Sequence, residues 1–181
     1  MVPTIASRLR NLIKSMHEVL LPALDPDHAI AQEQGQLMLG SLHLILGQID
    51  FAHAYEVVEA RTMSAHARDL TATLERDPAA LNLVHQIRRD LQAQLAAIEN
   101  PLTPLCELQA ENSRLREHLH ALITAAQAST DVALRRAVER KVDEFGEHQL
   151  ARERSWVAAT NFDPPGSLPM IPAVLKLPTT Q

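Results

Sequence analysis

The most apolar stretch of the chain, residues 36–58, constrains the fold more than any other feature. It reads QLMLGSLHLILGQIDFAHAYEVV and lies within the longest uninterrupted helical pattern of the sequence. On a helical wheel its Leu and Ile side chains point in nearly every direction, and a helix that is apolar on all sides is buried on all sides. We therefore predict a central helix that is buried by its own bundle or by a second copy of the chain.

The composition favours the packing of helix against helix. The chain has 181 residues and is 46% hydrophobic, but it is only 3% aromatic and contains five glycines. A core of Leu, Ile, Val and Ala suits helices, and so few glycines argue against the many tight turns of a β fold. We predict an all-α fold, a helical bundle of about five helices with one long central helix.

Helix starts are predicted where a capping side chain precedes a proline. Asp25-Pro26, Asp77-Pro78 and Thr103-Pro104 each have this pattern, because a proline at the first helical position loses only a donor that would be unpaired anyway. An earlier helix is predicted over residues 5–24, with Thr4 as its N-cap. Pro22 is expected to disturb the last turn of that helix.

At two places the sequence does not decide between one continuous helix and two shorter ones. The second helix would cover residues 26–76 as one rod, or it would bend or break near 47–51, where Gly47 weakens the pattern. The last two helices, from Pro104 to about residue 159, are separated by a weak break at 129–131. If the chain does not break there, these two helices form one continuous rod.

The composition changes after Ala159. The last 22 residues contain five prolines, at positions 164, 165, 169, 172 and 178, so we predict that they form neither helix nor central strand. The same segment is too apolar for a plain disordered tail. We predict one bundle domain over residues 1–159 and an extended Pro-rich strap over residues 160–181. The apolar side chains expected to contact the bundle or a partner are Phe162, Leu168, Met170, Ile171 and Leu175.

Charge and cysteine content limit the classes of function. The net charge of −5 gives no reason to expect nucleic acid, and the single cysteine, Cys106, allows no intramolecular disulfide. The N-terminus lacks the apolar region of a secretory signal, and the apolar stretch is interrupted too often to span a membrane. We expect a soluble, cytoplasmic protein of bacterial type that binds no membrane.

A heptad pattern in the helix after Pro104 predicts a surface for association. Its residues alternate spacings of three and four, as in a coiled-coil seam, and a buried Asn at an a position can fix the register of two chains. Equally, such a seam faces a neighbouring helix in any bundle. The seam consists of Leu105, Leu108, Asn112, Leu115, Leu119 and Leu122.

Histidines and acids at helical spacing suggest a second kind of site. A carboxylate-bridged metal site in a bundle needs two Glu-x-x-His pairs and two further Glu, and the sequence offers only one such pair. Acid and His neighbours of this kind are common on helix surfaces. The candidate ligand or metal residues are His43, His53, Glu56, Glu117 and His120. We expect no cofactor.

Two further features are interpreted as structural. Basic residues from Arg135 to Arg154 alternate with acids, which is typical of a solvated helix face, and no aromatic residues are interleaved to stack bases. Cys106 lies near a helix start, where a thiol can be activated, but a small apolar filler is the more common role.

These observations favour a non-enzymatic interaction or scaffold module. We expect a homodimer that binds protein partners through its helical faces or its tail. The alternative is a helical bundle with an internal site for an apolar ligand or a metal, near His43, His53 and Glu56. An enzyme of unrecognised type also stays open, because catalytic sites are assembled in space rather than in sequence.

Overall fold

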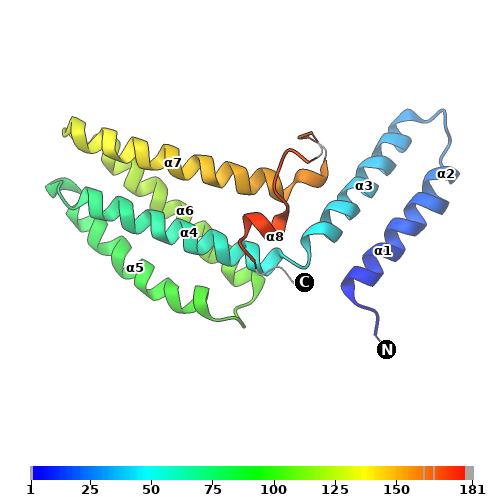
Figure 1. The fold of residues 1–181 in the computed structure, drawn as a ribbon, viewed down its shortest axis with the longest axis horizontal. Helices are drawn as coiled ribbons and strands as arrows, with labels where there is room; N and C mark the ends of the chain where they lie inside the picture. Colours follow the sequence, from blue (N-terminus) through cyan, green and yellow to red (C-terminus); the bar gives the residue numbers. More distant parts are fainter. Residues whose placement is uncertain (1, 161, 165, 178–181) are drawn as a thin grey trace. The chain divides into compact units, whose positions relative to one another are not determined.

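The computed structural model describes residues 2–160, 162–164 and 166–177, which form helices joined by loops, with no strand among them (Figure 1). The prediction of an all-α fold is confirmed. The chain divides into two compact units, unit 1 (residues 1–51 and 152–181) and unit 2 (residues 52–151). The predicted domain boundary after Ala159 is not one of these divisions, and it stays a prediction. Within the described ranges, no helix is both long and apolar enough to cross a membrane.

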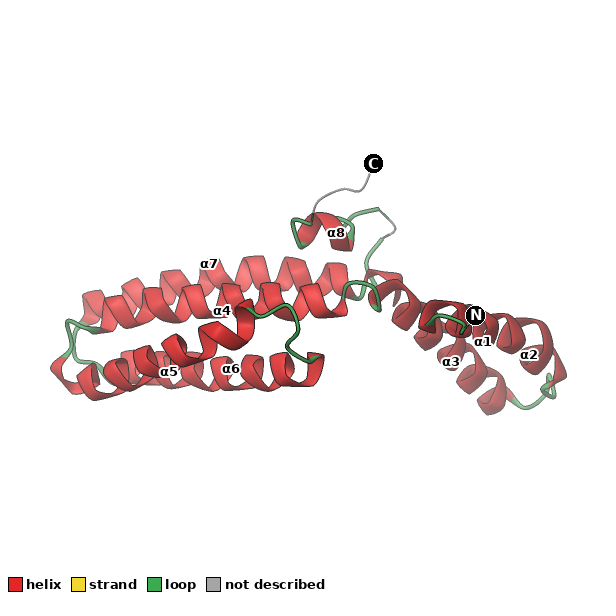
Figure 2. Cartoon of the chain, turned by 90° about the horizontal axis from the view of Figure 1, so that it is seen from below, coloured by secondary structure: helices red, strands yellow, loops and turns green. Residues whose placement is uncertain are grey.

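Unit 2 is an up-and-down bundle of long helices. These are α4 (Ala52–Leu74), α5 (Leu81–Glu99), α6 (Leu105–Ala128) and α7 (Val132–Trp156), and α7 continues beyond the unit. Short loops connect consecutive helices, which run in opposite directions (Figure 2). α4 packs most extensively against α6. The largest completely buried side chains of this core include Leu70, Leu74, Ile87, Ile98, Leu115 and Leu122.

Unit 1 begins with a helical hairpin. Its first arm is α1 (Ile5–Ser15), a π-helical turn (Met16–Leu20) and α2 (Leu21–Ala23), and its second arm is α3 (Ala29–Gln48). The unit also contains the end of α7, a 3₁₀ turn (Ala158–Thr160) and α8 (Ile171–Val174). The side chain of Gln48 donates to the backbone oxygen of Trp156 at 2.8 Å, which links the end of α3 to the end of α7.

The start and end of the first arm follow the predicted local chemistry. The Thr4 side chain accepts a hydrogen bond from the backbone N–H of Ser7, which confirms Thr4 as the N-cap. The disturbance expected at Pro22 is the π-helical turn, in which the N–H of Leu21 bonds to the oxygen of Met16, five residues back. A wider turn of this kind accommodates a proline, which has no N–H and crowds the preceding turn.

The predicted long central helix is wrong, and its alternative is confirmed. The rod over residues 26–76 is divided into α3 and α4 by a turn at residues 49–51, where the N–H of Phe51 bonds to the oxygen of Gln48 at 2.9 Å. Gly47 and Asp50 both have low helix propensity, so the helix ends there at little cost. The break at 129–131 likewise separates α6 from α7.

The three Pro-containing joints behave differently. The Asp77 side chain accepts from the N–H of Ala79 and starts a 3₁₀ turn (Pro78–Ala80) that leads into α5, as predicted. Asp25 instead binds the N–H of Asp27, so the next helix begins at Ala29 rather than at residue 26, with His28 as its cap. The Thr103 hydroxyl does not cap α6 but donates to the backbone oxygen of Ala97 at 2.7 Å.

The C-terminal segment contains a short helix, so the prediction that it holds no helix is wrong. Pro172 is the second residue of α8, a position where its missing N–H would be unpaired anyway. The predicted contact residues separate into classes: Leu175 is buried, Leu168 and Ile171 are half-buried, and Phe162 and Met170 are exposed. Pro165 and Pro178 lie outside the described residues.

This difference in burial predicts different effects of truncating two apolar side chains of the segment. Leu175 is 3% exposed and Phe162 is 90% exposed. We expect Leu175→Ala to lower the free energy of unfolding by about 2–5 kcal/mol, because it leaves a cavity. Phe162→Ala should change it by no more than about 0.5 kcal/mol. Urea unfolding of both variants checks this, and equal losses in the two would contradict the burial of Leu175.

Candidate functional site

The predicted heptad seam lies inside unit 2, where α6 packs against α4 of the same chain. Leu108, Leu115 and Leu122 are completely buried, whereas Leu105, at the start of the helix, is 37% exposed. The face is therefore filled by residues of one chain, as expected for a seam within a bundle. A contact between two copies through this face stays a prediction.

Asn112 ties α6 to α4. It is completely buried, and its Nδ2 donates to Glu56 Oε2 at 2.6 Å and to the Glu56 backbone oxygen at 3.0 Å. Gln109 Nε2 also donates to Glu56 Oε1, at 3.3 Å. A buried amide bonded to a carboxylate is oriented strongly, so this contact selects the register between α4 and α6.

A buried carboxylate connects α4 to α7. Glu59 is completely buried, and Gln149 Nε2 donates to its Oε1 at 2.6 Å. Burying a carboxylate is costly unless it is hydrogen-bonded. The sequence signals nothing of this, because a Glu on a helix is usually a surface residue.

The predicted ligand and metal residues have separate environments. His43 is exposed on α3, with Nδ1 2.9 Å from the oxygen of Leu39, and His53 Nε2 lies 3.1 Å from the oxygen of Thr103. Glu117 and His120 are exposed on α6. Among the described residues, no group of three or more His, Cys, Asp or Glu side chains is placed to hold a metal ion. Cys106 is exposed.

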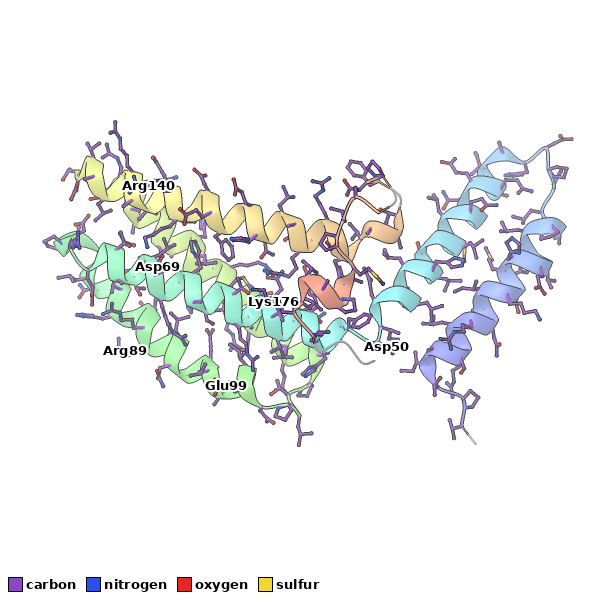
Figure 3. The ribbon with its side chains drawn as sticks, viewed as in Figure 1. Asp50, Asp69, Arg89, Glu99, Arg140 and Lys176 are labelled. Carbon is purple, nitrogen blue, oxygen red and sulfur yellow. The ribbon has the colours of Figure 1, made fainter. Side chains whose placement is uncertain are left out.

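His66 lies in the seam between α4 and α7. It is 9% exposed, and its ring stacks on Phe145 with 4.3 Å between the ring centroids. Its buried Nε2 has no hydrogen-bond partner within the described part of the chain. One turn further, Asp69 pairs with Lys141; Figure 3 shows Asp69 on α4 and Arg140, the preceding residue, on α7. Burial lowers the pKa of His66; Asp69 opposes this and Lys141 adds to it.

Three basic residues of α7 form pairs with groups outside that helix. Besides Lys141, Arg154 pairs with Asp163, and Arg135 donates to the backbone oxygen of Ser129 at 2.5 Å. The hydrogen bond from Arg154 lowers the pKa of Asp163 and so favours its charged form. These side chains therefore hold α7 to neighbouring segments, in addition to forming part of the solvated face that the sequence predicts.

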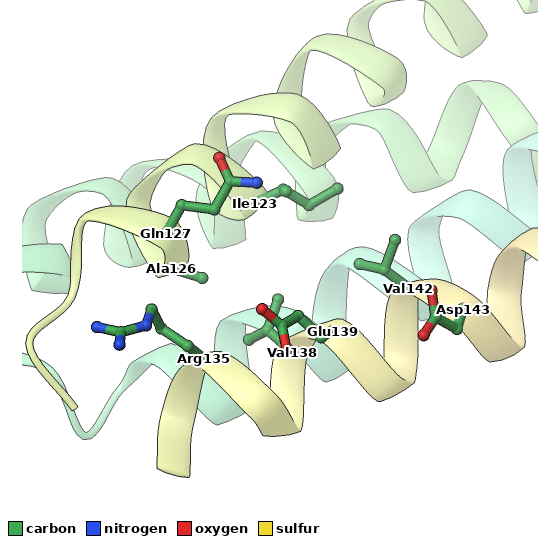
Figure 4. A pocket seen from close by; sticks show the side chains of 8 residues that line it. All are labelled: Ile123, Ala126, Gln127, Arg135, Val138, Glu139, Val142 and Asp143. Carbon is green, nitrogen blue, oxygen red and sulfur yellow. The ribbon is translucent and has the colours of Figure 1, made fainter. Parts of the chain in front are cut away.

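A shallow cavity of about 250 Å³ lies between α6 and α7 (Figure 4). Its apolar wall comes from Ile123, Val138 and Val142, and its rim carries Arg135 and Glu139. Small-molecule sites usually measure roughly 300–1,000 Å³. This cavity is smaller than that range, so we do not assign it a ligand.

The largest concentration of exposed apolar side chains is on the α1–α3 hairpin. The buried core of the hairpin consists of Met16, Leu21 and Leu39. Gly35 allows the two arms to approach, since a Cβ there would lie 2.5 Å from Leu21 Cδ2. The apolar surface of the hairpin is formed by eight side chains that are 45–70% exposed: Ile5, Leu12, Val19, Leu20, Ile30, Leu37, Met38 and Ile45.

The centre of this apolar surface follows from the register of the hairpin. Leu21 meets Gly35, and the arms run in opposite directions, so counting back along the first arm matches counting forward along α3. Val19 and Leu12 then lie within one residue of the levels of Met38 and Ile45, respectively. At about 100° per residue, all four positions project to the same side of the hairpin, beside its buried core. Exposed apolar patches of this extent mark interaction sites in soluble proteins.

Helical periodicity does not separate this surface from the core on the first arm. Leu12 and Val19 belong to the same apolar stripe as Met16, which is buried. The available signal was the spacing of Ile5, Leu12 and Val19, seven residues apart on the edge of that stripe. A stripe this wide needs more than one neighbouring helix to cover it.

Comparison with known proteins does not identify the chain. No protein-family model matches it, and neither a curated protein nor a solved structure is similar enough to count as a match.

The lowered pKa of His66 predicts a pH-dependent stability. Above the ordinary pKa of about 6.5, the ring is neutral in both the folded and the unfolded chain. As the pH falls through this value, the unfolded chain takes up a proton first, so the free energy of unfolding decreases until the folded ring is protonated too. His66→Phe, which keeps a ring to stack on Phe145, should reduce this decrease. Urea unfolding at a series of pH values measures it.

His120→Phe is the matched control, because His120 is exposed on α6. That variant should retain the pH dependence of the unmodified chain. An unchanged pH dependence in His66→Phe would show that other groups cause the effect.

Proposed function

We propose that this protein is a non-enzymatic interaction module that forms a homodimer through the apolar surface of its α1–α3 hairpin. The observation that carries the proposal is that surface: eight large apolar side chains stay 45–70% exposed on a hairpin whose buried core contains only Met16, Leu21 and Leu39. Two helices joined in this way bury too little surface to account for so apolar a sequence.

A second copy of the chain is the occupant that suits this surface best. Two hairpins packed side by side form a four-helix bundle, which is the usual way for such hairpins to complete a core. In a two-fold dimer the same surface meets itself, so a charge near the two-fold axis would face its own copy. The α3 arm avoids this conflict, because Glu33 is its only Asp, Glu, Lys or Arg residue.

The exposed area is of the size a dimer needs. Complete burial of a Leu, Ile or Met side chain removes roughly 60–120 Å² of apolar surface. Eight side chains that are 45–70% exposed therefore offer roughly 280–560 Å². A standard interface buries about 800 Å² on each partner, and about 60% of that is apolar. The upper part of the hairpin's range reaches this apolar share, which is roughly 480 Å².

A charge at the centre of the apolar surface should dissociate the dimer. We expect Met38→Glu to weaken self-association by on the order of a hundredfold, because each copy would bury an unpaired carboxylate. Gln36→Glu is the matched control, since Gln36 is exposed on the same helix but projects away from the surface. Light scattering over a range of concentrations measures the association. An unmodified chain that is monomeric throughout would refute the proposal.

The tail should not be needed for the dimer. A chain that ends at Ala159 retains the whole α1–α3 hairpin, so we expect it to remain dimeric, with reduced stability because Leu175 is lost. Light scattering and thermal unfolding of the shortened chain test both parts. If the shortened chain is folded but monomeric, the dimer interface lies in residues 160–181 instead.

A further inference from the structure

The side of the hairpin opposite its apolar centre carries a basic groove. A groove of about 470 Å³ lies between the first arm and α3. Arg10, Lys14 and His17 line it from the first arm, and His43 lines it from α3. Ile13 and Leu46 supply its apolar floor. The hairpin is therefore two-sided, apolar on one side and basic on the other.

The groove is locally positive, although the protein as a whole carries a net negative charge. The chain has a net charge of −5, yet α1 contains Arg8, Arg10 and Lys14 and no acidic residue. Arg10 and Lys14 are four residues apart, a spacing at which like charges repel along a helix. The acidic residue that lines the groove is Glu18, whose Oε2 lies 3.9 Å from Lys14 Nζ. Exposed pairs at this distance contribute little, so the cations stay available to an anion.

His43 is oriented so that its outer nitrogen is free for a ligand. Its Nδ1 lies 2.9 Å from the backbone oxygen of Leu39, an acceptor, so Nδ1 carries the hydrogen. Nε2 is then the nitrogen left to face the groove.

We propose that this groove binds the phosphate monoester group of a small organic molecule or a lipid. Arg10 and Lys14 neutralise the phosphate, the imidazoles of His17 and His43 donate to its oxygens, and Ile13 and Leu46 contact the apolar part next to the phosphate. Guanidinium and ammonium groups together provide the donors and charge that phosphate requires. This inference is independent of the proposed dimer, which uses the other side of the hairpin.

Two probes distinguish the sources of the phosphate. Phenyl phosphate represents a soluble ester, and phosphatidylcholine vesicles that contain phosphatidic acid represent a lipid headgroup. Calorimetry measures the first and vesicle sedimentation the second, both with the full chain at fixed ionic strength. Binding of phenyl phosphate supports a soluble ligand, and binding of the vesicles alone supports a headgroup. Binding of neither probe would overturn the proposal.

Variants of the groove test whether binding occurs there. Arg10→Gln combined with Lys14→Gln should weaken binding of the effective probe by about tenfold or more. Arg8→Gln is the matched control, because Arg8 is an exposed cation of α1 that does not line the groove. All three positions are exposed, so thermal unfolding should be unchanged. Equal losses in the double variant and the control would show non-specific attraction and refute the site.

Removing the Glu18 carboxylate should strengthen binding of the probe instead of weakening it. Glu18→Gln leaves Lys14 unpaired and should tighten binding by up to about fivefold. Weaker binding in Glu18→Gln would contradict the placement of the anion next to Lys14.

Discussion

The close contact between α4 and α6 is the interaction on which unit 2 depends. Small side chains recur on one face of α4 at spacings of three and four, at Ala60, Ser64, Ala67 and Thr71, and all of them are buried. Such a face allows a neighbouring backbone to approach, and α6 is the helix that α4 packs against most extensively. The hydrogen bonds from Asn112 to Glu56 then select one register among those that apolar packing alone would permit.

α7 is attached to this pair by a different kind of contact. Glu59 with Gln149, His66 with Phe145, and Asp69 with Lys141 follow one another along the two antiparallel helices. Two of these three contacts are polar, and His66 leaves a ring nitrogen without a hydrogen bond among the described groups. Burial lowers the pKa of His66, so protonation of this ring opposes the packing of the α4–α7 seam.

The α1–α3 hairpin shows why an apolar sequence does not specify its own covering. The run of Leu and Ile in α3 correctly indicates that this helix needs apolar neighbours on several sides. Within the chain, the first arm covers one side, and Leu37, Met38 and Ile45 remain 45–59% exposed. The prediction of burial on all sides is therefore met only in part by a single chain, and this is the ground on which the proposed dimer rests.

Local chemistry was readable from the sequence by itself, which determined the all-α class and the caps at Thr4 and Asp77. It left the break at residues 129–131 as one of two alternatives. These features depend on residues within a few positions of one another. Only the tertiary structure decided that Glu59 is buried, that Asn112 bonds to α4 of its own chain, and that Arg10, Lys14 and His43 share a groove. Each of these brings together residues more than 25 positions apart, and periodicity records which face of a helix is apolar but not what will cover it.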